Sequence, residues 1–275
     1  MQGKIVYSVI FPEPGSLGEE RSDDVKRWLK ESLLPRGIAT LNEDETNAYL
    51  VATGDGGLIK AIREKYNKGK VFVGANRGTV GFMLNPIDTI DDLPLDFDEL
   101  KLISLGLIQV TFVLKDGTQV GPFIVSNDVM CGGKPAAWIK FTIRGSLSYY
   151  PKRVSRGTTV FVSTPLGSTG LALNARFTGA VLPLDSNVWY VGGIATGPYP
   201  CDVVTPQKIT IEVESRHPVF GYADGQGIEV ENIAKVIIEP TDKFATLGFL
   251  KKIDFAARRT QLAQRVERGE LYENA

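Results

Sequence analysis

The sequence has few of the side chains that hold metals or build histidine-based catalytic sites. Its 275 residues include one histidine, His217, and two cysteines, Cys131 and Cys201. Zinc sites with several cysteine and histidine ligands are therefore excluded, and catalytic triads that need histidine are nearly excluded as well. Two cysteines far apart in the chain suit a reducing compartment.

An excess of charge of one sign is also missing. The 31 basic and 32 acidic residues leave a formal net charge of -1, so no overall electrostatic field favours nucleic acid or an anionic membrane as a partner. The apolar run at the amino terminus is shorter than the roughly 7–15 residues of a signal-peptide core. The longest other apolar stretch, 102–114, is shorter than the ~18 residues of a membrane span. We expect a soluble, cytoplasmic protein.

Residues 1–100 alternate between strand-like and helix-like patterns, with short connections. The strand-like runs are 5–11, 48–52 and 70–73, and the helix-like segments are 19–34 and 58–66. This alternation is typical of an open, mostly parallel sheet, whose ligands gather at the carboxyl ends of the strands. We expect an α/β domain over residues 1–100.

The pattern changes after residue 101. Two alternating runs, 102–114 and 118–129, flank Lys115-Asp116-Gly117, and Asp-Gly between such runs is a strong hairpin signal. Further strand-like runs follow at 137–143, 158–163, 188–194, 208–213 and 234–238. We expect a mostly-β, sandwich-like domain over residues 101–240. The segment 241–275 carries a helix-like stretch at 253–268 and is expected to return to the first domain.

A glycine-rich turn, Thr53-Gly54-Asp55-Gly56-Gly57, joins a buried-type strand to the start of a helix. Glycines there let a phosphate approach the backbone amides, and a helix N-terminus attracts anions. A carboxylate in such a turn repels phosphate. Asp55 makes sense if it takes a proton from an attacking hydroxyl or holds a metal ion, as phosphoryl transfer requires. The alternative is that Asp55 only caps the helix.

Three further segments place polar residues at strand ends or breaks. They are the glycine-rich turn GANRGTVGF at 74–82, SND at 126–128 within an apolar strand, and STPLGSTG at 163–170 after a strand. The hydroxyls and amides of the last segment suit phosphate or ribose. Each segment also has a purely structural interpretation, as a strand exit, a solvent-facing pair at a sheet edge, or a capping segment rich in Ser and Thr.

Together and in this order, these segments resemble the NAD kinase family, which phosphorylates the 2′-hydroxyl of the adenosine ribose of NAD. The family shows GGDGT, GxNxGxLGFL, NE or ND within a strand, DGxxVSTPTGSTAY, and DGQ. This chain offers TGDGG at 53–57, GANRGTVGFML at 74–84, SNDV at 126–129, TTVFVSTPLGSTGL at 158–171 and ADGQ at 223–226. The resemblance covers most of the chain and implies an α/β domain joined to a mostly-β domain.

The resemblance also implies roles for matched positions. Asp55 corresponds to the catalytic aspartate, which is thought to activate the 2′-hydroxyl. Asn127 and Asp128 match the pair that engages the adenosine moiety. The other implied binding residues are Gly54, Gly56, Gly57, Asn76, Arg156, Thr169, Gly170, Leu171 and Asn174. No residue of the chain is assigned as a metal ligand.

The substrates that the resemblance implies are NAD and ATP, or polyphosphate in place of ATP, with Mg²⁺ spreading charge over the transferred oxygens. It further implies a homodimer or homotetramer, without nucleic acid or membrane partners. Two alternatives stay open: a non-catalytic sensor that binds NAD(P), and a lipid or small-alcohol kinase that shares the GDG turn.

The chain departs from the family pattern at several positions. Thr53 replaces a glycine and Gly57 replaces a threonine, an exchange expected to take a hydroxyl out of the turn that meets the phosphate donor. Leu171 replaces a tyrosine, so an aromatic stacking surface is lost. Thr158 replaces an aspartate, and the later histidine-containing turn of the family is not recognisable in residues 192–206. The altered turn and the lost tyrosine are what motivate the sensor alternative.

Overall fold

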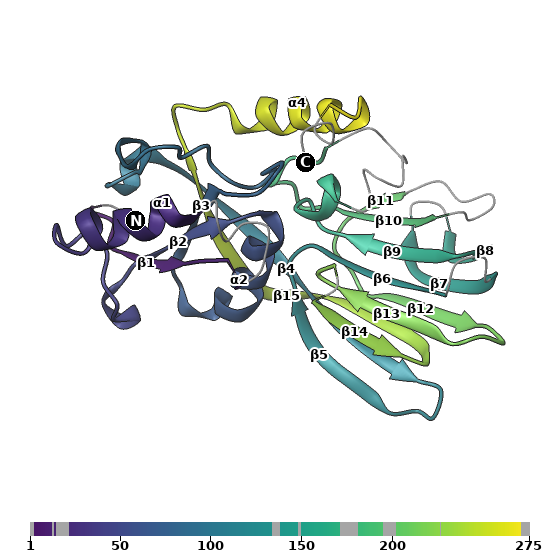
Figure 1. The fold of residues 1–275 in the computed structure, drawn as a ribbon. Coiled ribbons are helices and arrows are strands. Elements are labelled where there is room, and N and C mark those ends of the chain that lie inside the picture. Colours follow the sequence, from purple (N-terminus) through teal and green to yellow (C-terminus); the bar gives the residue numbers. More distant parts are fainter. Residues whose placement is uncertain are drawn as a thin grey trace. The chain divides into compact units, whose positions relative to one another are not determined.

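The computed structural model describes residues 3–12, 14, 22–133, 138–147, 150–170, 181–194, 202–225 and 227–270 (Figure 1). The chain divides into two compact units. Unit 1 comprises Met1–Leu105 and Phe244–Ala275, and unit 2 comprises Gly106–Lys243. Two long strands, β4 (Leu100–Leu114) and β15 (Ile233–Leu250), run from one unit into the other. Over the described residues, no helix is long and apolar enough to cross a membrane.

Unit 1 is built on an open parallel sheet, as the alternating pattern predicts. Strands β1 (Tyr7–Ile10), β2 (Ala48–Thr53), β3 (Val71–Asn76) and the end of β15 lie side by side in that order, each parallel to its neighbour. Every residue of β2 is buried, as is usual for parallel strands covered on both faces. Thr53 at the end of β2 pairs with Asn76 at the end of β3. The turns that follow these two strands therefore begin at the same edge of the sheet.

Two helices cover the two faces of this sheet. On one face, Val25 of α1 (Asp23–Trp28) belongs to the same buried apolar cluster as Leu50 of β2. On the other face, the Lys65 ammonium of α2 (Asp55–Lys65) lies 5.3 Å from the ring centroid of Tyr49. The opposite placement follows because successive residues of a strand point to opposite faces.

Shorter helical turns complete unit 1. The helix predicted over 19–34 begins at Asp23 and passes at its end into a π-helical turn, Leu29–Leu33. Four 3₁₀ turns lie at Glu43–Glu45, Tyr66–Lys68, Ile90–Asp92 and Phe97–Glu99.

The chain returns to unit 1 at its end and forms α4 (Phe255–Glu267), the last helix in Figure 1. Its N-cap is Asp254, whose carboxylate accepts a hydrogen bond from the Ala257 amide at 3.0 Å. The Phe255 ring stacks on Phe249 of β15, with ring centroids 3.8 Å apart. These contacts fix the start of α4 against the sheet.

Unit 2 is a sandwich of two sheets, as predicted. In one sheet β15, β12, β7 and β8 follow one another, and β4 pairs with β15 and β5; the other has the order β11-β10-β9-β6-β13-β14. Apolar residues of both sheets, such as Phe112, Cys131 and Phe141, form one shared core. The strand bounds are β5 Gln119–Val125, β6 Asp128–Gly133, β7 Ile139–Leu147, β8 Tyr150–Gly157, β9 Thr159–Ser163, β10 Trp189–Ile194, β11 Asp202–Val204, β12 Ile209–Glu214, β13 Val219–Ala223 and β14 Ile228–Glu231.

The hairpin predicted at Asp116-Gly117 is confirmed, because β4 and β5 pair antiparallel on either side of it. Gly117 has a φ of 89°, in the left-handed region that glycine enters without strain. The single run predicted over 118–129 is wrong. It breaks into β5 and β6, and Ser126 and Asn127 lie at the break.

Candidate active site

The two glycine-rich turns of unit 1 touch each other through their backbones. A Cβ built on Gly78 would lie 2.8 Å from the Gly54 Cα, closer than any side chain tolerates. The Arg77 amide donates a hydrogen bond to the Thr53 carbonyl at 2.9 Å. Glycine is therefore required at Gly78 by close approach, and the segments after β2 and β3 form one structure at the carboxyl edge of the sheet.

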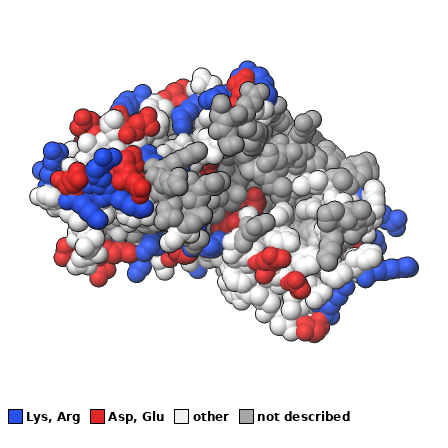
Figure 2. Space-filling view, viewed as in Figure 1, with Lys and Arg blue, Asp and Glu red and all other residues white. Residues whose placement is uncertain are grey.

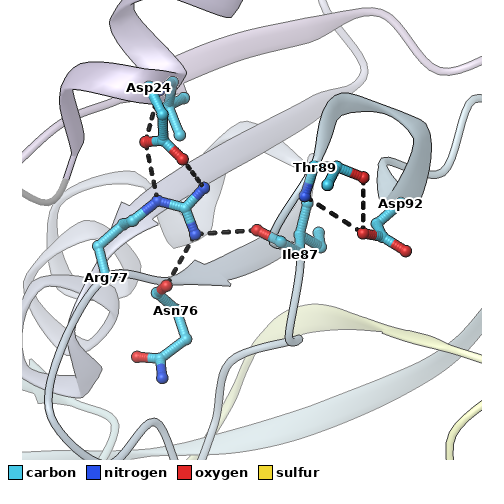
Figure 3. A network of polar contacts seen from close by, with 7 residues as sticks. Asp24, Asn76, Arg77, Ile87, Thr89 and Asp92 are labelled. Carbon is cyan, nitrogen blue, oxygen red and sulfur yellow. Dashed lines mark hydrogen bonds and ion pairs between the residues drawn. The ribbon is translucent and has the colours of Figure 1, made fainter.

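Arg77 anchors the second turn (Figure 3). Its buried guanidinium forms a two-pronged ion pair with Asp24 of α1, in which Nη2 lies 2.9 Å from Oδ2 and Nε lies 3.2 Å from Oδ1. It also donates to the carbonyls of Asn76 at 2.8 Å and Ile87 at 2.9 Å. With these acceptors engaged, Arg77 ties α1 to the turn and is a structural residue.

Asn76 shapes the same turn from inside. Its side-chain oxygen accepts a hydrogen bond from the Gly78 amide at 3.0 Å. Its amide group lies against Gly81, where an added Cβ would come within 2.4 Å. The structure therefore gives Asn76 a role in the turn itself, and ligand binding by Asn76 stays a prediction.

Asp55 reaches across to the segment after the second turn. Its Oδ2 accepts from the Phe82 amide and its Oδ1 from the Met83 amide, each at 2.9 Å. The interpretation of Asp55 as a helix cap is wrong, because the N-cap of α2 is Gly54, which has no side chain, and Asp55 is the first residue inside the helix. The carboxylate is thus held in a defined orientation by two backbone donors.

Burial raises the pKa of Asp55 above its ordinary value, while the Met83 and Phe82 amides and the charges of Arg258 and Arg259 limit the rise. A raised pKa suits a carboxylate that has to take up a proton. Each carboxylate oxygen has two lone-pair sites, and one amide occupies one of them on each oxygen. Asp55 therefore retains the capacity to accept a further hydrogen bond from a hydroxyl.

A pocket of about 540 Å³ lies beside the first turn, within unit 1. Its described lining residues are Ile10, Phe11, Pro12, Thr53, Gly54, Gly56, Gly57, Lys60, Ala61, Glu64, Lys65, Gly78 and Thr79. Backbone of the turn, two lysines and an apolar wall from the end of β1 thus surround one space. Such a combination suits a ligand with a phosphate part and an apolar part.

The positive charge at this pocket is local. On the face of unit 1 visible in Figure 2, basic and acidic side chains are interspersed. Both lysines of the pocket lining have acidic partners, because the Lys60 ammonium lies 3.9 Å from the Glu64 carboxylate and the Lys65 ammonium lies 2.6 Å from that of Glu43. Attraction of an anion therefore depends on local groups, the two lysines and the N-terminus of α2, in keeping with the net charge of -1.

The side chain of Thr53 fills the space that a side chain at residue 57 would need. A Cβ on Gly57 would lie 2.6 Å from both Cβ and Oγ1 of Thr53, and the Thr53 hydroxyl donates to the Gly54 carbonyl at 2.9 Å. The turn therefore keeps one hydroxyl, and the loss of a hydroxyl contact to the phosphate donor at residue 57 stays a prediction. Thr53 brings its own hydroxyl to the turn and to the pocket wall, in the space that a residue-57 side chain would need.

In unit 2, three of the predicted segments come together around Asp224. The buried Asp224 carboxylate accepts through Oδ1 from the amides of Ser126 at 2.9 Å and Asn127 at 2.8 Å. The Asp128 carboxylate accepts two hydrogen bonds, one from the amide of the next residue, Gly225, at 3.4 Å and one from the Asn127 side-chain amide at 3.2 Å. The ADGQ segment thus holds the SND segment in place.

The STPLGSTG loop packs on the same residues. Thr164 donates through its hydroxyl to the Ser126 carbonyl at 2.7 Å and through its amide to the Asn127 carbonyl at 2.9 Å. A Cβ on Gly170 would lie 3.6 Å from Asn127 Nδ2 and 3.9 Å from Asp128 Oδ2. Burial raises the pKa of Asp128 to about 6, against the lowering effect of the Gly225 amide. We name the residues 126–128, 163–170 and 223–225 the polar cluster.

Of the remaining predicted residues, Thr169 belongs to the polar cluster and Arg156 lies apart from it. Thr169 is buried in the loop, and its hydroxyl donates to the Leu166 carbonyl at 3.4 Å. Arg156 is exposed on β8 opposite Lys140, and strand β9, which is about 16 Å long at ~3.3 Å per residue, separates it from the loop. Leu171 and Asn174 lie outside the described residues.

Sequence reasoning missed the roles of Thr164, Asp224 and Arg258. Thr164 and Asp224 lie inside the quoted motifs, and their signal is a polar residue directly after a strand, where backbone donors and acceptors need partners. Arg258 lies on α4, and no local signal connects it to Asp55.

Comparisons with known proteins place the chain among relatives of one kind. It is 30% identical over 221 residues to the NAD kinase of Rickettsia bellii, covering 76% of this chain and 82% of that protein. It is 29% identical over 224 residues to the NAD kinase of Hyphomonas neptunium, covering 76% and 81%. The sequence matches no protein-family model.

Solved structures agree on the fold. An NAD kinase from Archaeoglobus fulgidus, crystallised in complex with ATP, has a TM-score of 0.66 at 16% identity and covers 94% of this chain and 99% of that one. Yeast NADH kinase complexed with NADH has a TM-score of 0.67 at 14% identity and covers 93% and 86%. From its relatives in sequence and the shared fold, the chain belongs to the NAD kinase family.

Proposed function

We propose that this protein is an NAD kinase that transfers the γ-phosphoryl group of ATP to the 2′-hydroxyl of the adenosine ribose of NAD. The 2′-oxygen forms a bond to the γ-phosphorus, and the bond from that phosphorus to the bridging oxygen of ATP breaks, releasing ADP. The hydroxyl proton passes to a carboxylate oxygen of Asp55. The products are NADP, ADP and a proton.

The observation that carries this proposal is that two backbone amides fix the Asp55 carboxylate, which lies in the chain between two glycines that line the pocket of unit 1. A hydroxyl is a weak nucleophile at neutral pH, so a fixed carboxylate and good positioning contribute most of the catalysis. Asp55 is fixed by two amides, and the pocket begins at the adjoining Gly54 and Gly56. Base and phosphate site are thus neighbours in the chain and in space.

We assign the pocket to the donor nucleotide. The amides at the start of α2 and the Lys60 ammonium suit the phosphates, and Ile10 and Phe11 suit the base. The complex of the Archaeoglobus fulgidus enzyme with ATP supports ATP as the donor.

We assign the adenosine part of NAD to the polar cluster of unit 2. Asn127 and Asp128 are buried, and their positions are fixed by Asp224, Gly225 and the STPLGSTG loop. Buried polar groups held by such bonds recognise a partner at little cost in reordering. The complex of yeast NADH kinase with NADH supports a dinucleotide as the acceptor.

Magnesium enters this proposal as part of the donor substrate, MgATP. No cluster of three or more His, Cys, Asp or Glu side chains able to hold a metal ion occurs among the described residues. Magnesium in phosphoryl-transfer sites is commonly bound by substrate phosphates together with one or two carboxylates, and the Glu64 carboxylate lines the pocket. The ion would spread the charge of the transferred oxygens.

The test is incubation of the purified protein with NAD, ATP and Mg²⁺, with NADP measured by an NADP-specific dehydrogenase. NADP formed in proportion to enzyme and time supports the proposal. Binding of NAD in a calorimetric titration without any NADP would favour the sensor instead, and polyphosphate in place of ATP tests the other donor. Phosphorylation of a lipid or a small alcohol, but not of NAD, would favour the alternative of a lipid or small-alcohol kinase.

We also propose a homodimer or homotetramer. Trp138, directly before β7, and Val154 of β8 are exposed by 68% and 52%, and the alternation of the two strands places them on the outer face of their sheet. Large apolar side chains on such a face favour a protein partner. Analytical ultracentrifugation of the chain and of Trp138→Ser measures the assembly, and the cytoplasmic location stays a prediction.

A further inference from the structure

The turn at residues 81–84 is held from two sides. On one side, the Asp55 carboxylate accepts from the amides of Phe82 and Met83. On the other side, Nη1 of Arg258 donates to the carbonyl of Gly81 at 3.0 Å and to that of Leu84 at 2.8 Å. Four backbone groups of one short turn thus bind one carboxylate and one guanidinium.

The helix that carries Arg258 is attached independently of this contact. Phe255 stacks on Phe249, Asp254 caps the helix, and Leu262 and Ala263 are buried. Loss of the Arg258 side chain therefore frees the turn but leaves several other contacts that hold α4. This separation lets the function of Arg258 be tested without removing the helix.

We propose that Arg258 is a positioning residue for Asp55, holding the 81–84 turn so that its amides orient the carboxylate toward the reacting hydroxyl. The inference rests on the proposed kinase activity. The physical reason is that a base acts only within hydrogen-bond reach of its proton, and small errors in placement lower the rate steeply. A turn free to move would carry the carboxylate with it.

The charges around Asp55 add a second consequence. Both Arg258 and Arg259 of α4 favour its ionised form, and the other groups that face it are the Phe82 and Met83 amides. Asp88 faces Arg258 from the loop after β3. Removing the Arg258 charge leaves burial of Asp55 less compensated, so its pKa rises. The acid limb of the kcat profile should therefore move to higher pH.

The experiment compares Arg258→Gln and Arg258→Lys with a control on the same helix, Arg265→Gln, whose side chain is 48% exposed. NADP formation is measured across pH, and hydrogen exchange is followed at the Phe82 and Met83 amides. For Arg258→Gln we expect kcat to fall at least about tenfold with KM values changed less than about twofold, and both amides to exchange about tenfold faster. The lysine variant should restore the position of the acid limb, and the control should match the wild type.

Unchanged exchange at both amides together with an unchanged kcat in Arg258→Gln would overturn the inference. If Arg258→Gln does not fold, kcat and the exchange rates of the two amides in Arg258→Lys test the inference instead. Lysine keeps the charge but lacks the planar guanidinium that donates to the carbonyls of the turn. If the wild-type protein forms no NADP, the proposed function fails. The exchange rates then still show whether Arg258 holds the turn.

Discussion

We expect the protein to tolerate a side chain at residue 57 only when the side chain of Thr53 is removed. In the present structure a Cβ on Gly57 would lie 2.6 Å from the Thr53 Cβ and Oγ1 and 2.9 Å from its Cγ2. Gly56, the preceding residue of the same helix turn, has open space at its Cβ position. Gly57→Ala and Gly56→Ala therefore form a matched pair in which only the first variant creates a clash.

Helix propensity and overpacking can both be expressed as changes in the free energy of unfolding. Alanine in place of glycine in a helix is worth up to about 1 kcal/mol in favour of folding, and both variants share this gain. Overpacking at a filled site costs about 1–3 kcal/mol, and only Gly57→Ala carries that cost. We expect Gly57→Ala to be less stable than Gly56→Ala by about 1–3 kcal/mol.

The assay is urea unfolding, which gives the free energy of unfolding of each variant. The double variant Thr53→Gly, Gly57→Thr restores the arrangement seen in the family pattern and should recover most of the stability that Gly57→Thr alone loses. A coupling free energy between the two positions of about 1–3 kcal/mol is the expected result. Additive effects at residues 53 and 57, or equal stability of the two alanine variants, would refute the reasoning.

Two further predictions address the donor pocket and the polar cluster. Lys60→Ala should raise the KM for ATP about tenfold, a loss of about 1.4 kcal/mol of binding free energy, and leave the KM for NAD unchanged. Lys68→Ala, at an exposed position, is the control. If Lys60→Ala and the wild type had equal KM values for ATP, the assignment of the donor to this pocket would be wrong. The folded-state pKa of Asp128 is raised to about 6, so its stabilising contribution is full below pH ~4 and is lost as pH rises through about 6, by at most about 3 kcal/mol. Asp128→Asn should therefore gain stability relative to the wild type between pH 4 and 8, and a difference that does not vary with pH would contradict the shifted pKa.

Local patterns predicted the elements that are specified locally. The parallel strands β2 and β3, the hairpin at Asp116-Gly117 and the loop after β9 all follow from residue spacing and turn chemistry. Strands β8, β11, β13 and β14 were not predicted. The second residue of β8 is a proline, and three further residues, Lys152, Arg153 and Arg156, are charged. The sequence of β8 therefore shows no clear alternation of apolar and polar residues. The strand forms because the tertiary fold places it beside β7.

Motif order indicated the segments of the candidate site, and the binding roles of their residues stay predictions; contacts over long sequence distances were beyond its reach. The Asp224 carboxylate binds amides 97 and 98 residues earlier in the chain, and Arg258 binds carbonyls 174 and 177 residues away. Such pairs depend on tertiary packing, for which a single sequence carries no periodic signal. The exchange between Thr53 and Gly57 was visible in the sequence, and only the geometry shows that the two residues share one space.

The most direct test of the central claim compares the wild-type protein with Asp55→Asn in the conversion of NAD and MgATP to NADP. Asparagine keeps the size of the side chain but cannot take up the hydroxyl proton. We predict that the wild type forms NADP and that Asp55→Asn forms none above background, while its circular dichroism and its binding of NAD are retained. NADP formation by Asp55→Asn at the wild-type rate would contradict the account.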